Sequence, residues 1–572
     1  MSAAPYKKYL DSKWVNKKLQ SLNLKEKIGQ LFIVEAFSTD IESENVYRVI
    51  ESIKKFNIGG ITFFQGNIKN QAYLTNKFQQ EAKIPIFINI DAEWGLGMRL
   101  DDAVTFPYNM ALGAIEEDSL IYDYAKNLAK QLKRIGSQSP LAPVVDINNN
   151  PENPVINYRS FGENKYRVAN KGVAFIKGLQ SENILDNAKH FPGHGDTDTD
   201  SHLGMPVLNH SFEQIDEIDL YPFKKMIEAG ASSIMSAHLH IPSIDNEKDI
   251  PASLSKKAIN ELLKEKLNFK GLVISDAFDM QGITNFYNAG EADPIAIYAG
   301  NDMISLSTDL EKAINKIHSD VLNSNISEKY IEDKCREILA VKQWMKLDKI
   351  QNVKLENIVE EINNEESDRL NEKLADAATT LLKYNGKISV DKNSSTAFLY
   401  ISNKDISLSK WAQIQHHQQA AVQRTYTNSF AESLVDSFPN NDHFSWNTEN
   451  EISALKKIVG DIKNHDRIVI SVHGLNIKPI NNFDIPVQAL PVLKELFSSK
   501  KVTFILFGNA YALNHFENVE MAENIIITYQ ENEFFHKSVS DLLIRGKHLS
   551  ATLPVSVNEH YKEGDGVKGF AN

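Results

Sequence analysis

A short segment between Lys189 and His202 concentrates residue types that can do acid/base or metal chemistry. It reads KHFPGHGDTDTDSH, with three histidines, three aspartates and a lysine among two glycines and a proline. A packed helix or strand cannot supply partners for so many histidines and carboxylates at once. The segment is therefore predicted to be a loop that carries chemistry.

A calcium loop is one interpretation of this segment, because Asp196, Asp198 and Asp200 have Asp-x-Asp-x-Asp spacing. An EF-hand loop also needs a glycine at its sixth position and a bidentate glutamate at its twelfth. This chain has Ser201 and Val207 at those positions. The spacing therefore disfavours calcium.

A zinc site built from His190, His194 and His202 is a second interpretation. These residues lack a His-x-x-x-His pair with a glutamate on one helix, and Pro192 with Gly193 prevents the first two histidines from sharing a helix face. We therefore expect no metal and no cofactor in the function of this segment.

A third interpretation treats the polar residues as turn caps, which suits Asp196 and Asp198. It does not explain Asp200 together with His202. Residues two apart in an extended segment point to the same side, so Asp200 can accept the Nδ1 proton of His202 and leave the other ring nitrogen facing outward. The pair is a candidate general acid/base.

The elements that must position these residues follow an α/β rhythm, in which short apolar strands alternate with helical patterns over residues 1–350. Eight predicted strands favour a (β/α)8 TIM-type barrel, whose active site lies at the C-terminal strand ends. The predicted strands are residues 30–37, 58–64, 84–91, 141–147, 187–190, 232–238, 271–277 and 302–306. The polar residues at their C-terminal ends are Asp91, Asp146, Lys189, His190, His238 and Asp276.

A second domain is predicted after the barrel. Residues 327–346 form a helical pattern around the single cysteine, Cys335, which we expect to be a buried core thiol. We place the catalytic barrel at 1–350, a helical linker at 351–390 and a smaller α/β sandwich domain at 391–572. The strands predicted in this domain are residues 396–401, 467–472, 502–507 and 524–529.

Composition limits the partners. The chain has 572 residues, of which 42% are apolar and 24% charged, as in ordinary soluble two-domain proteins. Its formal charge of -13 and the lack of a long basic run disfavour nucleic acid and anionic membranes. No apolar run is long enough to predict a membrane span, and the first residues do not resemble a signal peptide. A neutral small molecule is the expected ligand.

The segment 189–206 resembles the signature of the β-N-acetylglucosaminidase branch of glycoside hydrolase family 3. The resemblance covers most of the first domain and, more weakly, the second near 546–555. It implies a retaining exo-β-N-acetylglucosaminidase that acts on terminal β-linked N-acetylglucosamine in muropeptides or related glycans. Four other segments agree in the family's order: IDAEWGLGMR at 90–99, APVVD at 142–146, YRSFGE at 158–163 and VISD at 273–276.

The resemblance assigns roles to matching positions. Asp276 is the implied nucleophile that forms a covalent glycosyl-enzyme, His202 the acid/base and Asp200 its dyad partner. Most retaining glycosidases use two carboxylates, so histidine in the second role is unusual. Residues at five further positions match those that bind the terminal sugar: Asp91, Arg99, Arg159, Lys189 and His190.

Departures from the family pattern affect the aglycone side. The usual Gln-Glu-Gly-Gly after the first sugar-binding aspartate is Ala-Glu-Trp-Gly at 92–95. Trp94 is either an aromatic platform for a sugar or a packing residue. Gly193 and Gly195 predict a mobile loop that closes over substrate.

Several functions stay open. A broader β-glucosidase-type hydrolase and an N-acetylglucosaminide phosphorylase are the alternatives within the family, and a non-catalytic sugar-binding protein is the alternative outside it. The presence of Asp276 with the Asp200 and His202 dyad argues against a dead site. A carbohydrate substrate is the partner we expect, and nothing in the sequence indicates the oligomeric state. Two-domain length favours an exported, periplasmic or cell-envelope protein over a cytoplasmic one.

Overall fold

The computed structural model describes residues 4–197, 204–349, 351–403, 406–407, 426–498 and 501–571. The chain divides into two compact units. We call Met1–Phe106, Asp118–Ser160 and Lys165–Ser367 the barrel unit. We call Pro107–Glu117, Phe161–Asn164 and Asp368–Asn572 the sandwich unit. Two short segments of the N-terminal half thus belong to the second unit, and the domain boundaries drawn from the sequence stay a prediction.

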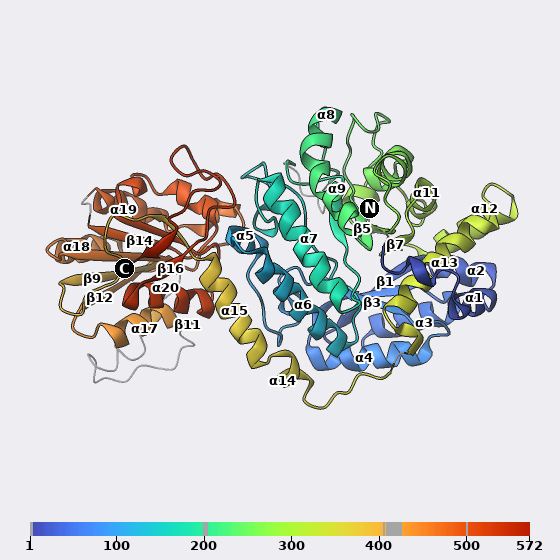
Figure 1. Ribbon diagram of the computed structural model, residues 1–572, viewed down its shortest axis with the longest axis horizontal. Coiled ribbons are helices and arrows are strands. Elements are labelled where there is room, and N and C mark those ends of the chain that lie inside the picture. Colours follow the sequence, from blue (N-terminus) through green and yellow to red (C-terminus); the bar gives the residue numbers. More distant parts are fainter. Residues whose placement is uncertain are drawn as a thin grey trace. The chain divides into compact units, whose positions relative to one another are not determined.

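Seven parallel strands form the sheet of the barrel unit, in the order β3-β2-β1-β7-β6-β5-β4 (Figure 1). Most of their residues are buried, as expected for a parallel sheet covered on both faces. Seven of the eight strands predicted for the barrel are confirmed. They are β1 (Phe32–Ser38), β2 (Gly60–Gly66), β3 (Phe87–Ile90), β4 (Ala188–Phe191), β5 (Ser233–Ser236), β6 (Leu272–Ala277) and β7 (Met303–Ser305).

The eighth predicted strand, at 141–147, is wrong as a regular strand, although the chain around it closes the barrel. It runs between the two edge strands: Ile90 of β3 donates its N–H to the Ser139 carbonyl at 3.1 Å, and Lys189 of β4 donates to the Pro143 carbonyl at 3.0 Å. Pro143 within this stretch and Pro140 just before it lack the N–H that a regular ladder needs. Isolated bonds therefore complete the TIM-type barrel that the sequence predicts.

Helices surround this sheet and begin at capping residues. The Asn67 side chain accepts the Asn70 N–H at the start of α4, and Ser327 accepts the Tyr330 N–H at the start of α13. Cys335 lies in α13 and is buried, as predicted. The helices are α1 (Lys13–Gln20), α2 (Leu24–Gly29), α3 (Glu44–Phe56), α4 (Ile68–Glu81), α6 (Asp118–Ile135), α7 (Lys165–Ser181), α8 (Phe212–Gln214), α9 (Leu220–Ala229), α10 (Gln281–Thr284), α11 (Ala292–Ala299), α12 (Leu310–Leu322), α13 (Glu328–Trp344) and α14 (Ile358–Ile362). Further helical segments are η1 (Lys7–Tyr9), η2 (Leu96–Met98), η3 (Asn157–Arg159), η4 (Ile215–Asp219), η5 (Ala252–Leu254), η6 (Lys257–Lys266) and η7 (Leu347–Lys349).

The sandwich unit is built on a six-stranded sheet in the order β12-β9-β13-β14-β15-β8. Its strands are parallel except β8, which pairs antiparallel with β15 at the edge. The four strands predicted here are confirmed as β9 (Thr396–Ser402), β13 (Arg467–His473), β14 (Val502–Leu506) and β15 (Asn524–Ile527). The sequence analysis missed β8 (Thr380–Lys383) and β12 (Asp442–Asn447).

Helices of the sandwich unit lie in pairs against this sheet: α17 contacts α20, and α18 contacts α19 (Figure 1). This arrangement confirms the predicted α/β sandwich. The helices are α5 (Asn109–Ala114), α15 (Glu365–Ala378, which begins in the barrel unit), α17 (Ser429–Ser437), α18 (Ile452–Ile462), α19 (Leu490–Phe497) and α20 (Glu533–Arg545). Two small ribbons complete the described strands: β10 (Ile406–Ser407) with β11 (Tyr426–Thr427), and β16 (Lys547–Leu549) with β17 (Gly569–Ala571).

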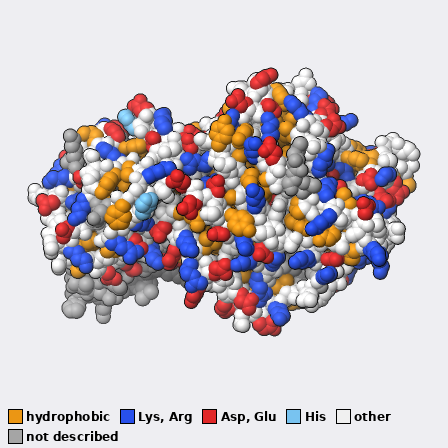
Figure 2. All heavy atoms as spheres, viewed as in Figure 1, with side chains coloured by type: hydrophobic (Ala, Val, Ile, Leu, Met, Phe, Trp, Pro, Cys, Tyr) orange, Lys and Arg blue, Asp and Glu red, His pale blue; other side chains and the backbone are white. Residues whose placement is uncertain are grey.

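The surface is of mixed charge. On the face drawn in Figure 2, acidic and basic side chains alternate over both units rather than gathering by sign. Among the described residues, no helix combines the length and the apolar character that crossing a membrane requires.

Candidate active site

Three of the predicted sugar-binding residues meet at the C-terminal end of β3 and β4. Asp91 directly follows β3 and lies between two cations. Its Oδ1 is 3.3 Å from the Lys189 Nζ, and its Oδ2 accepts a hydrogen bond of 2.5 Å from the Arg99 Nη2. The Arg99 guanidinium also lies 4.9 Å from the centre of the Phe64 ring, which fixes its direction. The structure thus brings together residues that are far apart in the sequence.

Glu93 extends this group, and the sequence analysis did not select it. Its carboxylate forms a bidentate pair with Arg159, at 2.9 Å to Nε and 2.7 Å to Nη2, and lies 2.9 Å from the Lys189 Nζ. The Glu93 side chain has no exposed surface. Its signal in the sequence was its place two residues after the strand-end Asp91, within a motif already noted. Glu93 therefore links two of the predicted sugar-binding cations.

Charge pairing keeps the buried residues Asp91, Glu93 and Lys189 ionised. Burial raises the pKa of Asp91, but Lys189 and Arg99 outweigh it and hold the pKa below its ordinary value. The same balance lowers the pKa of Glu93 strongly, through Arg159 and Lys189. Burial lowers the pKa of Lys189, but Glu93 and Asp91 more than compensate and raise it. The site therefore presents fixed charges in fixed directions.

His190 is held by Asp146, which follows the closing stretch of the barrel. Asp146 accepts three hydrogen bonds: from the His190 Nδ1 at 2.7 Å, from the His190 backbone N–H at 3.1 Å and from the His194 backbone N–H at 2.8 Å. Asp146 stood among the strand-end residues of the sequence analysis but was not selected for the site. It orients His190 and anchors the start of the loop.

Asp276, the predicted nucleophile, lies near the end of β6. Its Oδ1 accepts the Ala277 N–H at 2.8 Å, which fixes the direction of the carboxylate. Burial raises the pKa of Asp276, but the electrostatic effects of His190, His238 and Lys189, together with this backbone bond, lower it below its ordinary value. The carboxylate is therefore ionised and lies within the electrostatic field of His190 and Lys189.

His238 supports the chain just after Asp276. Its Nε2 donates a hydrogen bond to the Ala277 carbonyl oxygen at 2.9 Å, and its Nδ1 is 2.8 Å from the Ser253 hydroxyl. Both ring nitrogens are thus occupied by the protein. His238 therefore helps to fix the position of the last residue of β6.

The loop after β4 is described as far as Thr197. The predicted acid/base His202 and its partner Asp200 lie outside the described residues. A Cβ on Gly193 would come within 2.8 Å of the Asp219 side chain, and a Cβ on Gly195 within 1.6 Å of the Ile147 carbonyl. Both glycines are therefore required by close packing, and closure of the loop over substrate stays a prediction.

The barrel sequence decides the family. Residues 23–341 match the profile described as "Glycosyl hydrolase family 3 N terminal domain". The chain belongs to glycosyl hydrolase family 3.

Relatives within family 3 are similar over part of their length. Over 276 residues the chain is 38% identical to "Beta-hexosaminidase A" of Pseudoalteromonas piscicida, which covers 44% of this chain and 46% of that protein. Over 351 residues it is 27% identical to "Beta-N-acetylglucosaminidase/beta-glucosidase" of Cellulomonas fimi, which covers 60% of this chain and 61% of that protein. The chain thus spans about half to three fifths of the length of these curated relatives.

A solved family 3 structure matches nearly the whole chain. The β-N-acetylglucosaminidase from Paenibacillus sp. str. FPU-7 superposes with a TM-score of 0.76 at 27% identity, covering 94% of this chain and 99% of that one. The two-unit architecture is therefore that of a solved family 3 enzyme.

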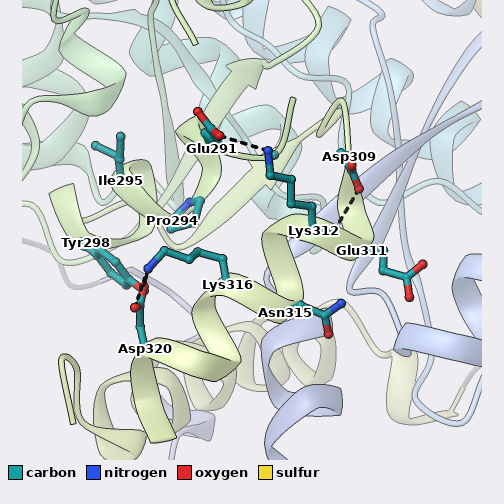
Figure 3. Close-up of a pocket in the computed structure, with 11 residues that line it drawn as sticks. Glu291, Pro294, Ile295, Tyr298, Asp309, Glu311, Lys312, Asn315, Lys316 and Asp320 are labelled. Atoms are coloured by element: carbon teal, nitrogen blue, oxygen red, sulfur yellow. Dashed lines mark hydrogen bonds and ion pairs between the residues drawn. The ribbon is translucent and has the colours of Figure 1, made fainter. Parts of the chain in front are cut away.

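A pocket of about 910 Å³ lies outside this site, between α11 and α12 of the family 3 barrel (Figure 3). Ion pairs line it: Lys312 Nζ is 3.1 Å from Glu291 Oε1, and Lys316 Nζ is 2.5 Å from Asp320 Oδ1. None of the predicted site residues lines this pocket. Its paired charges indicate a surface groove of the helical layer rather than a sugar site.

Trp94 follows β3 and is half-buried. Its ring lies 5.9 Å from that of Tyr158, centre to centre and tilted by 50°. This contact supports the packing alternative raised for Trp94, and contact with an aglycone stays a prediction.

Proposed function

We propose that this family 3 chain is a retaining exo-β-N-acetylglucosaminidase acting on terminal β-linked N-acetylglucosamine, in muropeptides or related glycans. One observation carries the proposal: Asp276 lies near the end of a barrel strand as an ionised carboxylate within the field of Lys189 and His190. A nucleophile needs that charge and a rigid mount. The similarity to a β-hexosaminidase and to a β-N-acetylglucosaminidase/β-glucosidase supports the substrate class.

In the first step, an Asp276 oxygen attacks the anomeric carbon as the bond to the leaving oxygen breaks. We assign the proton that this oxygen needs to His202, in its imidazolium form. Asp276 is then bonded to the sugar, and His202 is neutral. Asp200 is assigned to stabilise the imidazolium before the transfer.

In the second step, water attacks the same carbon and gives its proton back to His202. The bond to Asp276 breaks, and its carboxylate is restored. Two inversions at one carbon give net retention.

The ion-pair group beside Asp276 is assigned to hold the sugar ring. Glu93 already orients Lys189 and Arg159, so these side chains lose little conformational entropy when they bind the sugar hydroxyls. Contacts that strengthen as the ring flattens toward an oxocarbenium-like state lower the barrier.

Release of p-nitrophenol from the β-N-acetylglucosaminide tests this function. We expect turnover by the wild type and at least a 10³-fold loss in Asp276→Ala. Asp333→Asn, which alters an exposed ion pair in α13, is the matched control and should keep full activity. A mechanism-based fluorosugar should add one sugar mass to the peptide that contains Asp276. Undiminished turnover in Asp276→Ala would overturn the assignment.

The same assay separates the alternatives. Equal turnover of the plain β-glucoside indicates a broader β-glucosidase. A sugar 1-phosphate formed only when inorganic phosphate is present indicates a phosphorylase. Binding of N-acetylglucosamine without turnover of any glycoside indicates a non-catalytic sugar-binding protein.

A further inference from the structure

A compact group of metal-ligating residues lies in the sandwich unit, outside everything assigned above. His473 is the last residue of β13, Glu531 precedes α20, and His536 lies in the first turn and a half of α20. One ligand atom from each of the three residues lies within 4.8 Å of the other two. The group is buried, with side-chain exposures of 0% for His473, 10% for Glu531 and 5% for His536.

Both histidines aim one nitrogen at the same carboxylate oxygen. Glu531 Oε1 is 2.7 Å from the His473 Nδ1 and 2.9 Å from the His536 Nε2. The rings meet almost edge to face, with centres 5.9 Å apart, so the two nitrogens converge from different directions. The other oxygen, Oε2, accepts the Gly474 N–H at 2.7 Å, which fixes the carboxylate.

The far nitrogen of each ring is held by a hydroxyl. His473 Nε2 is 2.8 Å from the Ser471 Oγ, and His536 Nδ1 is 2.8 Å from the Ser429 Oγ. A hydroxyl can donate or accept. When the proton is on the nitrogen that faces Glu531, the hydroxyl can donate to the far nitrogen. When the nitrogen that faces Glu531 offers its lone pair to a metal, the far nitrogen carries the proton and the hydroxyl can accept it.

Asn428 also faces the inner nitrogen of His473. Its carbonyl oxygen caps α17 by accepting the Phe430 and Ala431 N–H groups, so its amide nitrogen points the other way, 3.1 Å from the His473 Nδ1. The single lone pair of Nδ1 can accept from this amide or bind a metal, but it cannot do both.

Aromatic rings shield the group from water. The Phe507 ring stacks on His473 at 4.8 Å and meets His536 edge to face at 4.9 Å, and Phe430 lies 5.8 Å from His473. An apolar shell strengthens the attraction between a cation and its ligands.

The group also lies where open α/β sheets bind ligands. In the sheet, β9 has β12 as its neighbour on one side and β13 on the other, and β14 and β15 continue on the side of β13. The order in which the chain adds strands to the sheet therefore reverses between β9 and β13. Ligands of such sheets bind outside the C-terminal strand ends at this kind of reversal. His473 occupies that end of β13.

We propose that His473, Glu531 and His536 bind one Zn²⁺, with water as the fourth ligand. Two neutral imidazoles and one carboxylate are a recognised zinc set. Without metal the three residues are joined by hydrogen bonds. Zinc at about 2.0 Å from each ligand atom sets those atoms about 3.3 Å apart, so the side chains must shift to admit the ion. The ion then fastens β13 to α20 and stabilises the sandwich unit.

Metal content and zinc titration of the full-length protein test this site. We expect one zinc per chain after expression in zinc-supplemented medium, and recovery of one equivalent when chelated protein is titrated with ZnCl₂. Glu531→Gln and His536→Ala should each lose this equivalent. Ser429→Ala removes only a hydroxyl behind His536 and should weaken zinc binding by about 10-fold.

Controls separate this site from other histidines and from loss of the fold. His210→Ala and His465→Ala alter histidines outside the group and should leave the zinc equivalent unchanged. Co²⁺ in place of zinc should give visible d–d bands in the wild type that Glu531→Gln lacks, and zinc should raise the melting temperature of chelated wild type but not of Glu531→Gln. Wild type that binds no zinc, or variants that bind as the wild type does while keeping its circular dichroism, would overturn the proposal.

Discussion

Glu93 and Arg159 are joined by two parallel hydrogen bonds, of 2.9 and 2.7 Å, with the carboxylate fully buried. The pair is the inner end of a chain of alternating charges that continues through Lys189 and Asp91 to Arg99. Three cations and two carboxylates make up this chain. Because each charge is held by its neighbours, one substitution disturbs the whole group.

Glu93→Gln is expected to lower kcat/KM of the proposed reaction by about 10²-fold, because Arg159 and Lys189 lose the group that aims them. Steady-state kinetics with the p-nitrophenyl glycoside measure this. Glu366→Gln breaks an exposed pair with Lys130 and should change nothing. Full activity in Glu93→Gln would show that the pair is not needed for positioning.

The stability contribution of Glu93 should depend on pH in a known direction. Its folded-state pKa lies below the unfolded value of about 4.3, so the contribution is complete above that value and disappears as pH falls through the folded pKa. Urea unfolding should show Glu93→Gln less stable than wild type by about 3–5 kcal/mol at pH 7. The difference should shrink at pH 3. A difference that grows with acidity contradicts this sign.

Asp146→Asn is expected to destabilise the barrel unit by about 2–3 kcal/mol, since an amide cannot accept three hydrogen bonds from His190 and His194. Activity should fall further than stability predicts, because His190 loses its orientation. Thermal unfolding and kinetics on one preparation measure both. An unchanged melting temperature would show that the amide satisfies the same donors.

His238→Gln should move the acid limb of the kcat/KM profile to higher pH. Activity requires Asp276 as a carboxylate, and His238 is one of the groups that lower its pKa, after burial raises it and His190 lowers it. Removing that effect raises the pKa, so activity is lost at a higher pH on acidification. A pH series for both proteins measures the shift, and a limb that moves to lower pH contradicts it.

Cys335 should not react in the folded protein. Its thiol is buried in α13, and burial raises its pKa to about 12. A thiol reagent at pH 8 should find no group in native protein and one per chain in urea. Rapid labelling without denaturant would show that α13 opens locally.

Much of the fold was predictable from local patterns. Alternating apolar strands and helices predicted seven barrel strands, the central strands of the sandwich and the core position of Cys335. The stretch at 141–147 misled because its apolar residues resemble a strand, while Pro143 within it and Pro140 just before it lack the N–H groups of a ladder. β8 was missed because it follows α15 after one residue, inside an apolar run that suits a helix equally well.

The order of amino acids alone established which residue types stand at the strand ends, and so the chemistry open to the chain. Only the tertiary structure decided how they are used. Glu93 contacts two cations, and Asp146 accepts a hydrogen bond from His190. The hydrogen bonds of Glu93 to Arg159 and of Asp146 to His190 join residues more than 40 positions apart. One oxygen of Glu531 is contacted by both His473 and His536, although the two histidines lie far apart in the chain. Burial of a charge has to be balanced by partners, and the fold alone determines which partners come within reach.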